Sequence, residues 1–191
     1  MALTNKEISK AFYENSTDKY GHGYYNMYAD LFARIGGVSK LLEIGVKKGN
    51  SLAAWIDIFP EASITGVDVR HPENLVEKAN ADQIIVTDSA RSSIKEKVGT
   101  GYDIIIDDGD HRLDWQTQTF MNLRDCWTKV YVVEDIFGIE EEKKLRKRFI
   151  SLGYTNFFTY TSNYRNQIVR MSGEDKKIDF LALAIFPRPF D

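Results

Sequence analysis

Residues 41–51 read Leu41-Leu42-Glu43-Ile44-Gly45-Val46-Lys47-Lys48-Gly49-Asn50-Ser51, and this stretch decides the fold of the 191-residue chain. It begins as an apolar strand, turns at two glycines and continues into residues with the apolar spacing of a helix. Glycine lets the backbone take up positive φ or approach a ligand closely, and the amides at the start of the next helix would face that ligand. The stretch therefore predicts a loop that cradles a nucleotide-like ligand.

The spacing of these glycines separates two classes of cofactor. The dinucleotide fingerprint is G-x-G-x-x-G, but Lys47 and Asn50 occupy the second and third glycine positions. An NAD-dependent oxidoreductase or epimerase is therefore disfavoured. The remaining pattern, E-x-G-x-x-x-G, resembles motif I of the class I S-adenosylmethionine (SAM) methyltransferases. The cofactor-binding residues expected from this motif are Glu43, Gly45, Gly49 and Ser51.

The composition predicts one soluble domain spanning residues 1–191. With 43% hydrophobic and 13% aromatic residues, the chain can build one sizeable core but not two. The charges are 25 basic against 28 acidic, and no strongly basic block indicates nucleic-acid binding, so a small or neutral partner is expected. No apolar run approaches the roughly 18 residues of a membrane-spanning helix. The single cysteine, Cys126, excludes an intramolecular disulfide and fits a reducing compartment, so we expect a cytoplasmic protein. The sequence is compatible with a monomer and with a homo-oligomer.

Strands and helices alternate after Gly36-Gly37, which predicts a mostly parallel sheet covered by helices on both faces. The expected class is α/β, a Rossmann-like methyltransferase fold with seven strands, the last two forming a reversed pair at one edge. We predict strands at Ser39–Ile44, Ser63–Val69, Gln83–Val86, Tyr102–Ile106, Val130–Val133, Asn156–Thr161 and Asp179–Phe186. Helices are predicted at Asn5–Tyr13, Tyr24–Ile35, Ser51–Phe59, Leu113–Cys126 and Ile139–Leu152, with another capped by Asp88 or Ser89.

Residues 1–37 are expected to form a helical segment that acts as a lid over the site. A loop with two glycines, Ser16–Tyr25, joins its two helices and carries several aromatic and imidazole groups. Taken together, these groups suggest a lid or a substrate wall. Packing against the core is the alternative for each of them. The substrate-contacting residues suggested here are Tyr20, His22 and Tyr24.

Acidic residues end five consecutive strands of the predicted sheet. In a doubly wound sheet, ligands bind outside the carboxyl ends of the strands. Asp68 lies 23 residues after Gly45, about where an acidic residue meets ribose hydroxyls. A helix cap is the alternative for any single acid, but five consecutive cases disfavour it. The further cofactor-binding residues expected are Asp88 and Ser89, which would face the adenine, and Asp107.

The sharpest constellation combines Asp107-Asp108-Gly109-Asp110-His111 with Glu134-Asp135. Carboxylates that converge from adjacent strand ends repel one another, and a hard divalent cation such as Mg²⁺ makes this arrangement tolerable. The ion could hold two vicinal hydroxyls of a substrate and lower the pKa of one, while His111 takes the proton. The alternatives are helix-start packing for His111 and a solvated loop start for Glu134-Asp135.

Three runs together resemble the metal-dependent sugar O-methyltransferases of macrolide biosynthesis, the mycinamicin and macrocin O-methyltransferases, and relatives acting on rhamnose. The runs are Leu41–Asn50, Ile104–His111 and Tyr131–Ile136, and Asp18-Lys19 with His22-Gly23-Tyr24 looks like the N-terminal segment of that family. The resemblance implies SAM as methyl donor. It implies catalytic roles for Asp108 and for His111, as general base, and Mg²⁺ held by Asp108, Glu134 and Asp135.

This chain departs from the family pattern at two places. Asp110 stands where the family usually has serine, which adds a negative charge beside the expected base. Asp125–Lys129 replaces a Lys-Pro-Gly-Gly turn before the fifth strand. Both departures concern the substrate more than the cofactor.

The sequence thus predicts a SAM-dependent O-methyltransferase acting on a sugar hydroxyl of a glycan, nucleotide sugar or glycosylated natural product. The alternative acceptor is another small molecule. A nucleic-acid methyltransferase lacks support, because the four prolines form no Asn-Pro-Pro-Tyr or Asp-Pro-Pro-Tyr motif. A non-enzymatic SAM-binding module is the remaining rival.

Overall fold

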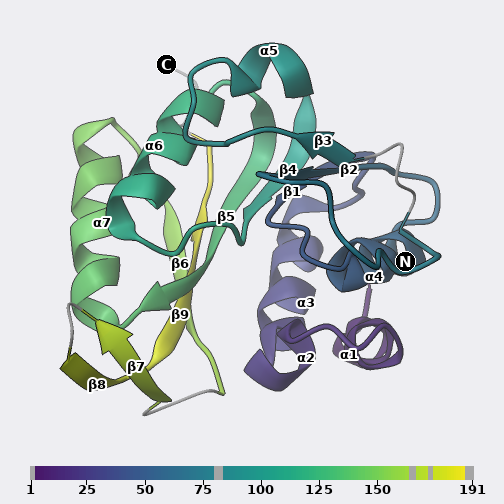
Figure 1. The fold of residues 1–191 in the computed structure, drawn as a ribbon, viewed down its shortest axis with the longest axis horizontal. Helices are drawn as coiled ribbons and strands as arrows, with labels where there is room; N and C mark the ends of the chain where they lie inside the picture. Colours follow the sequence, from purple (N-terminus) through teal and green to yellow (C-terminus); the bar gives the residue numbers. More distant parts are fainter. Residues whose placement is uncertain (1–2, 80–83, 164–166, 172–173, 188–191) are drawn as a thin grey trace.

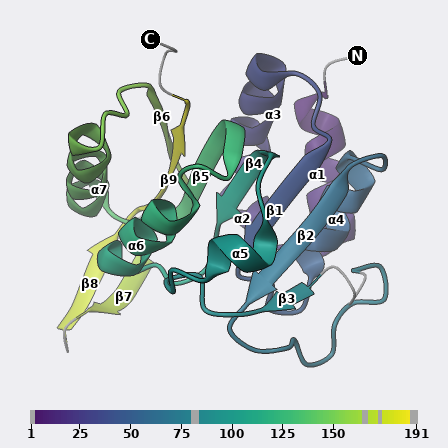
Figure 2. The ribbon, with the colours of Figure 1, turned by 90° about the horizontal axis from the view of Figure 1, so that it is seen from above.

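A computed structural model describes residues 3–79, 84–163, 167–171 and 174–187 of the chain. Its main sheet has seven strands in the order β3-β2-β1-β4-β5-β9-β6 (Figures 1 and 2). Within it β9 pairs antiparallel with both β5 and β6, while the other pairs are parallel. The predicted α/β class with an antiparallel pair at one edge is confirmed. The strands are β1 Lys40–Ile44, β2 Ser63–Asp68, β3 Ile84–Val86, β4 Tyr102–Asp107, β5 Trp127–Phe137, β6 Phe157–Thr161 and β9 Phe180–Ile185.

Helices cover both faces of this sheet, because successive residues of its apolar strands point to opposite sides. In β4, Ile104 and Ile106 pack in a core with α1, α3 and α4, whereas Ile105 packs in a second core with α5, α6 and α7. Within the described ranges no helix has both the length and the apolar composition needed to span a bilayer. The helices are α1 Asn5–Glu14, α2 Lys19–His22, α3 Tyr24–Ile35, α4 Asn50–Ile58, α5 Ile94–Val98, α6 Leu113–Leu123 and α7 Ile139–Ser151.

Two predicted helix boundaries are wrong. Asp88 and Ser89 do not cap a helix, because Asp88 Oδ1 accepts the amide of Ala90 in a turn and α5 begins only at Ile94. The helix α6 ends at Leu123, so Cys126 lies buried in the turn that leads into β5 rather than inside the helix. At Asp88 a side chain suited to a helix cap is used in a local turn instead, and at Cys126 the backbone amide closes a turn on the carbonyl of Leu123.

The strand β5 continues past the predicted end at Val133 through an irregularity in its pairing with β9. The register shifts between Val133 and Ile136, and Asp135 has a φ of 53°. Such a bulge bends a strand and redirects its side chains. A second difference is the hairpin of β7 Gln167–Met171 and β8 Glu174–Ile178, within a stretch predicted as a polar connection. The predicted residue Gln83 lies outside the described residues.

Candidate functional site

The glycine turn after β1 touches the loop after β4 through backbone atoms. Gly45 has a φ of 91°, and a Cβ at this position would lie 2.0 Å from the carbonyl oxygen of Asp108. Gly49, with a φ of 79°, precedes α4, and its Cβ would lie 2.7 Å from Leu75 and from Ala79. Both positions therefore require glycine. At Gly45 the backbone of the expected cofactor loop lies against the backbone of the acidic loop that contains Asp108.

Asp68 fixes the shape of the glycine turn. Its Oδ2 atom accepts the backbone amides of Val46 at 2.9 Å and Lys47 at 3.1 Å. Hydrogen bonds to an ionised acceptor are stronger than those between neutral groups. The half-buried carboxylate at the end of β2 thus holds the loop that the sequence assigns to the cofactor.

A cavity of ≈ 600 Å³ opens at the carboxyl ends of β1, β2, β3 and β4. It has the size of a small-molecule binding pocket. Its lining joins the two halves of the predicted site, because the glycine turn and the acidic loop both contribute, and it adds Trp115 and Phe137, which sequence reasoning missed. The predicted site residues that line it are Gly45, Asp68, Asp88, Ser89, Asp108 and His111.

The other predicted cofactor residues lie outside this cavity. Ser51 lines a second cavity of ≈ 330 Å³, and its Oγ donates to Glu43 Oε2 at 2.7 Å. Glu43 is fully buried. Gly45, Lys47 and Asp108 line both cavities, so the two spaces meet at these residues.

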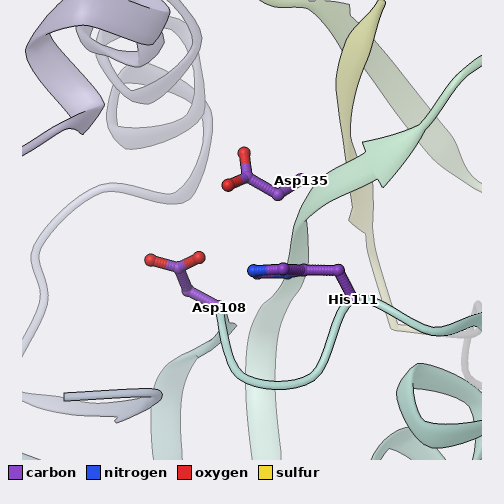
Figure 3. A group of neighbouring side chains, drawn as sticks. All are labelled: Asp108, His111 and Asp135. Atoms are coloured by element: carbon purple, nitrogen blue, oxygen red, sulfur yellow. The ribbon is translucent and has the colours of Figure 1, made fainter. Parts of the chain in front are cut away.

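Asp108, His111 and Asp135 bring their side chains together, and the first two of them line the larger cavity. One ligand atom from each lies within 4.8 Å of the others, and Figure 3 shows both carboxylates and the imidazole directed toward one another. Asp108 and His111 come from the loop after β4, and Asp135 comes from the bulge in β5. Carboxylate oxygen and imidazole nitrogen are ordinary ligands of divalent cations. We call these three residues the outer group.

Glu134 is not part of the outer group, and its side chain contacts a lysine that the sequence analysis did not assign to the site. Lys19 Nζ donates to Glu134 Oε2, lies 2.8 Å from Asp108 Oδ2 and lies 3.3 Å from Glu43 Oε1. The hydroxyl of Tyr28 donates to the other oxygen of Glu134. We call Glu43, Asp108 and Glu134 the inner group, because they surround the buried Lys19.

The charges of the inner group oppose the cost of burial. Burial lowers the pKa of Lys19, but Asp108, Glu134 and Glu43 outweigh it and raise that pKa well above its ordinary value. The ammonium therefore stays charged inside the protein, where an unpaired charge would be very costly.

The predicted substrate residues lie apart from the cavity lining. Tyr24 is 1% exposed and its hydroxyl donates to Asp135 Oδ1 at 2.8 Å, while His22 stacks on Tyr24 and lies 3.5 Å from the same oxygen. Tyr20 is 42% exposed and contacts Tyr13. Tyr24 therefore holds Asp135 by a hydrogen bond, and His22 packs beside them. The helices α1 and α3 belong to the core, and opening of residues 1–37 as a lid stays a prediction.

The neighbours of His111 bear on its expected role as a base. Its Nδ1 atom is buried without a hydrogen-bond partner among the described residues, and its ring lies 5.7 Å from that of Phe137. The extra charge of Asp110 is compensated, because Arg112 Nε donates to Asp110 Oδ1 at 2.8 Å and holds the pKa of that carboxyl below its ordinary value. Asp107 does not line the cavity, and its Oδ2 atom accepts a hydrogen bond from the hydroxyl of Tyr131.

The one signal that points to Lys19 is indirect. Carboxylates at adjacent strand ends require a positive partner, and Lys19 lies in the N-terminal stretch between the two predicted helices. Its distance of 89 residues from Asp108 along the chain leaves no local pattern that pairs them.

No protein-family model matches the sequence. No curated protein matches it either. Solved structures do resemble it. MycE methyltransferase from the mycinamycin biosynthetic pathway, in complex with Mg and SAH, is 26% identical with a TM-score of 0.58, over 68% of this chain and 39% of MycE. The chain thus spans less than half the length of MycE.

Two further structures match over most of their length. The O-methyltransferase TomG from Streptomyces achromogenes, in complex with SAM, is 14% identical with a TM-score of 0.52, covering 95% of this chain and 88% of TomG. An O-methyltransferase from Bacillus cereus, in complex with SAH, is 14% identical with a TM-score of 0.54, covering 98% of this chain and 93% of the Bacillus cereus protein. The chain has the class I methyltransferase fold, and the three structures named here are methyltransferases that hold SAM or SAH.

Proposed function

We propose that the chain transfers a methyl group from SAM to a hydroxyl group of a sugar or a glycosylated small molecule. The observation that carries this proposal is the joining of two parts. The cavity of ≈ 600 Å³ is lined by the cofactor-type glycine turn and by Asp108 and His111 of the outer group. The likeness to MycE, whose structure holds Mg, SAH and mycinamycin VI, supports a glycosylated acceptor.

The donor would occupy the end of the cavity lined by Gly45, Asp68, Asp88 and Ser89. Gly45 lets the backbone approach the ligand, and Asp68 would meet the ribose hydroxyls while holding the turn in shape. Ser89 is fixed by Thr119, whose Oγ1 lies 3.0 Å from its Oγ, and would face the adenine with Asp88. Preorganised contacts of this kind fix the donor relative to the acceptor, which supplies much of the rate of a transfer reaction.

The outer group fits a divalent cation. Lys19 engages one oxygen of Asp108 and Tyr24 one oxygen of Asp135, while no hydrogen bond from a described residue engages the second oxygen of either carboxylate. We propose Asp108 and Asp135 as ligands, and Glu134 can join them only when its hydrogen bond to Lys19 or Tyr28 opens. A divalent cation there would stabilise the deprotonated form of a substrate hydroxyl.

His111 would accept the proton of that hydroxyl. A general base must lie within hydrogen-bond reach of the proton that it removes, and His111 lines the cavity beside both carboxylates. Its unpartnered Nδ1 atom has no competing hydrogen bond among the described residues. Phe137 packs beside the imidazole and limits its contact with water.

A small aromatic hydroxyl compound is the second candidate acceptor. Trp115 and Phe137 line the same cavity and offer two aromatic surfaces, on which a planar acceptor would stack. The structural likeness to TomG, which is involved in tomaymycin synthesis, supports the fold for either acceptor.

Calorimetry and a labelled-methyl assay test the proposal. We expect one SAM per chain and metal-dependent transfer of the labelled methyl group to one member of a panel of glycosides and phenols. His111→Ala should reduce kcat by roughly 100-fold or more while SAM affinity stays unchanged. His71→Ala, in an exposed loop, is the matched control. Absence of SAM binding would refute the proposal, and metal-independent transfer would remove its metal part.

A further inference from the structure

Lys19 is a buried cation at the centre of the site. Its side chain is 1% exposed, although lysine is almost never fully buried without partners. It reaches carboxylates from three different strands, Glu43 in β1, Asp108 after β4 and Glu134 in β5. The ammonium group donates hydrogen bonds to Asp108 and Glu134, and Glu43 Oε1, at 3.3 Å, adds an ion pair without a hydrogen bond.

The inner group leaves little for another cation to bind. Glu134 gives one oxygen to Lys19 and the other to Tyr28, and Glu43 gives Oε2 to Ser51 while Oε1 faces Lys19. The 2.8 Å distance from Lys19 Nζ to Asp108 Oδ2 is that of a charge-assisted hydrogen bond. Lys19 therefore stands where a cation would bridge these carboxylates.

Asp108 belongs to both groups, and this sharing suggests what Lys19 replaces. In sites with two metal ions, a cluster of acidic residues holds ions roughly 4 Å apart and clamps the reacting oxygens between them. Here the outer group is one half of such a cluster, and its carboxylates keep oxygens without hydrogen bonds from described residues. The inner group is the other half, and it already contains the ammonium group of Lys19. The two halves differ because Lys19 is covalently part of the chain and cannot exchange.

We propose that Lys19 is an internal cation that takes the place of a second divalent ion and limits the protein to one metal ion, at the outer group. Lys19 is then a positioning residue, because it fixes Asp108 and Glu134 without touching the reacting atoms. The inference deepens the proposed function, since it concerns the same carboxylates. Its supporting contacts are nevertheless independent of methyl transfer.

The experiment counts bound Mn²⁺ per chain by electron paramagnetic resonance and calorimetry. Lys19→Ala removes the ammonium and leaves room for a hydrated ion. We expect one Mn²⁺ in the wild type, two in Lys19→Ala and one in Lys19→Arg, which keeps the charge. Lys129→Ala is the matched control, because Lys129 Nζ lies 3.1 Å from Asp103 Oδ1 in an ion pair away from the cluster, and it should leave the count unchanged.

The outcomes separate this inference from the proposed function. If the wild type binds no Mn²⁺, the metal part of the proposed function fails, but Lys19→Ala should still bind one ion more than the wild type. An equal count in both proteins would overturn the role of Lys19.

Thermal unfolding covers the case in which Lys19→Ala folds poorly. Mn²⁺ should then raise the melting temperature of Lys19→Ala by roughly 5 °C or more beyond the rise that it causes in the wild type. The double variant Lys19→Ala with Glu134→Gln, which removes one buried carboxylate, should fold without metal and bind no second ion. Failure of Mn²⁺ to stabilise Lys19→Ala, or a second ion in the double variant, would overturn the proposal.

Discussion

Asp107 is a buried carboxyl group whose ionisation should make the stability of the protein depend on pH. It ends β4, is 2% exposed and accepts the hydroxyl of Tyr131 at 3.1 Å. Burial raises its pKa to about 7 from an ordinary 3.8, although the hydrogen bonds from Tyr131 and Gly109 act in the opposite direction. The substitution Asp107→Asn removes this titration while keeping a similar shape.

The raised pKa of Asp107 sets the direction in which stability changes with pH. Folding favours the protonated form of Asp107, whereas the unfolded chain ionises it near its ordinary value. The stability that this group contributes is therefore fully present below about pH 4 and is lost as the pH rises toward 7. At about 1.4 kcal/mol per pKa unit, the wild type should lose ~2–3 kcal/mol between pH 5 and pH 8 through this group alone.

Urea unfolding at pH 5, 6, 7 and 8, without added metal, measures the effect. The stability of Asp107→Asn should fall by ~2–3 kcal/mol less than that of the wild type over this range. Asp103→Asn is the control. Burial raises the pKa of Asp103, but hydrogen bonds from Ser39 and Lys129 outweigh it and lower that pKa, so this group is ionised throughout the range. A difference between wild type and Asp107→Asn that stays constant from pH 5 to pH 8 would refute the reasoning.

Three further substitutions test the geometry of the site. Gly45→Ala places a Cβ 2.0 Å from the carbonyl oxygen of Asp108 at a φ of 91°, so it should cost at least ~2 kcal/mol in thermal unfolding and abolish SAM binding in calorimetry. Tyr24→Phe removes the hydrogen bond to Asp135 and should weaken Mn²⁺ binding by roughly 10-fold in a titration. Asp68→Asn weakens the hold on the glycine turn and should raise the KM for SAM by roughly 10-fold, with Mn²⁺ binding unchanged.

Matched controls accompany these substitutions. Gly37→Ala should unfold as the wild type does, since no atom lies within 4 Å of the added Cβ. Tyr13→Phe alters a hydroxyl on a side chain that is 67% exposed and should leave Mn²⁺ affinity unchanged. Equal losses in the control and the test variant would contradict the roles assigned to the site residues.

The strands and the cofactor loop were predictable because their signals are local. The run Tyr102–Ile106 is apolar except for Asp103, as expected for a strand buried on both faces, and the glycines at positions 45 and 49 mark the turn. The carboxyl ends of parallel strands meet at one edge of the sheet, so the meeting of Asp108 with Asp135 followed from the predicted fold.

The inner group was not predictable in the same way. Lys19 and Tyr28 reach Glu134 from helices far away in the sequence, and an exposed lysine looks the same in sequence as a buried one. The direction of Glu134 depends on the bulge in β5, which has no glycine or proline to mark it. Tertiary contacts therefore decide which carboxylates face the cavity and which face Lys19.

A crystal structure of the protein soaked with SAH and Mn²⁺ tests the central claim most directly. We predict SAH along Gly45, Asp68 and Ser89 in the cavity of ≈ 600 Å³, and one anomalous peak beside Asp108 and Asp135. Lys19 should keep its place between Asp108 and Glu134. SAH bound elsewhere, or an empty cavity at saturating SAH, would contradict the assignment of this chain as a SAM-dependent methyltransferase.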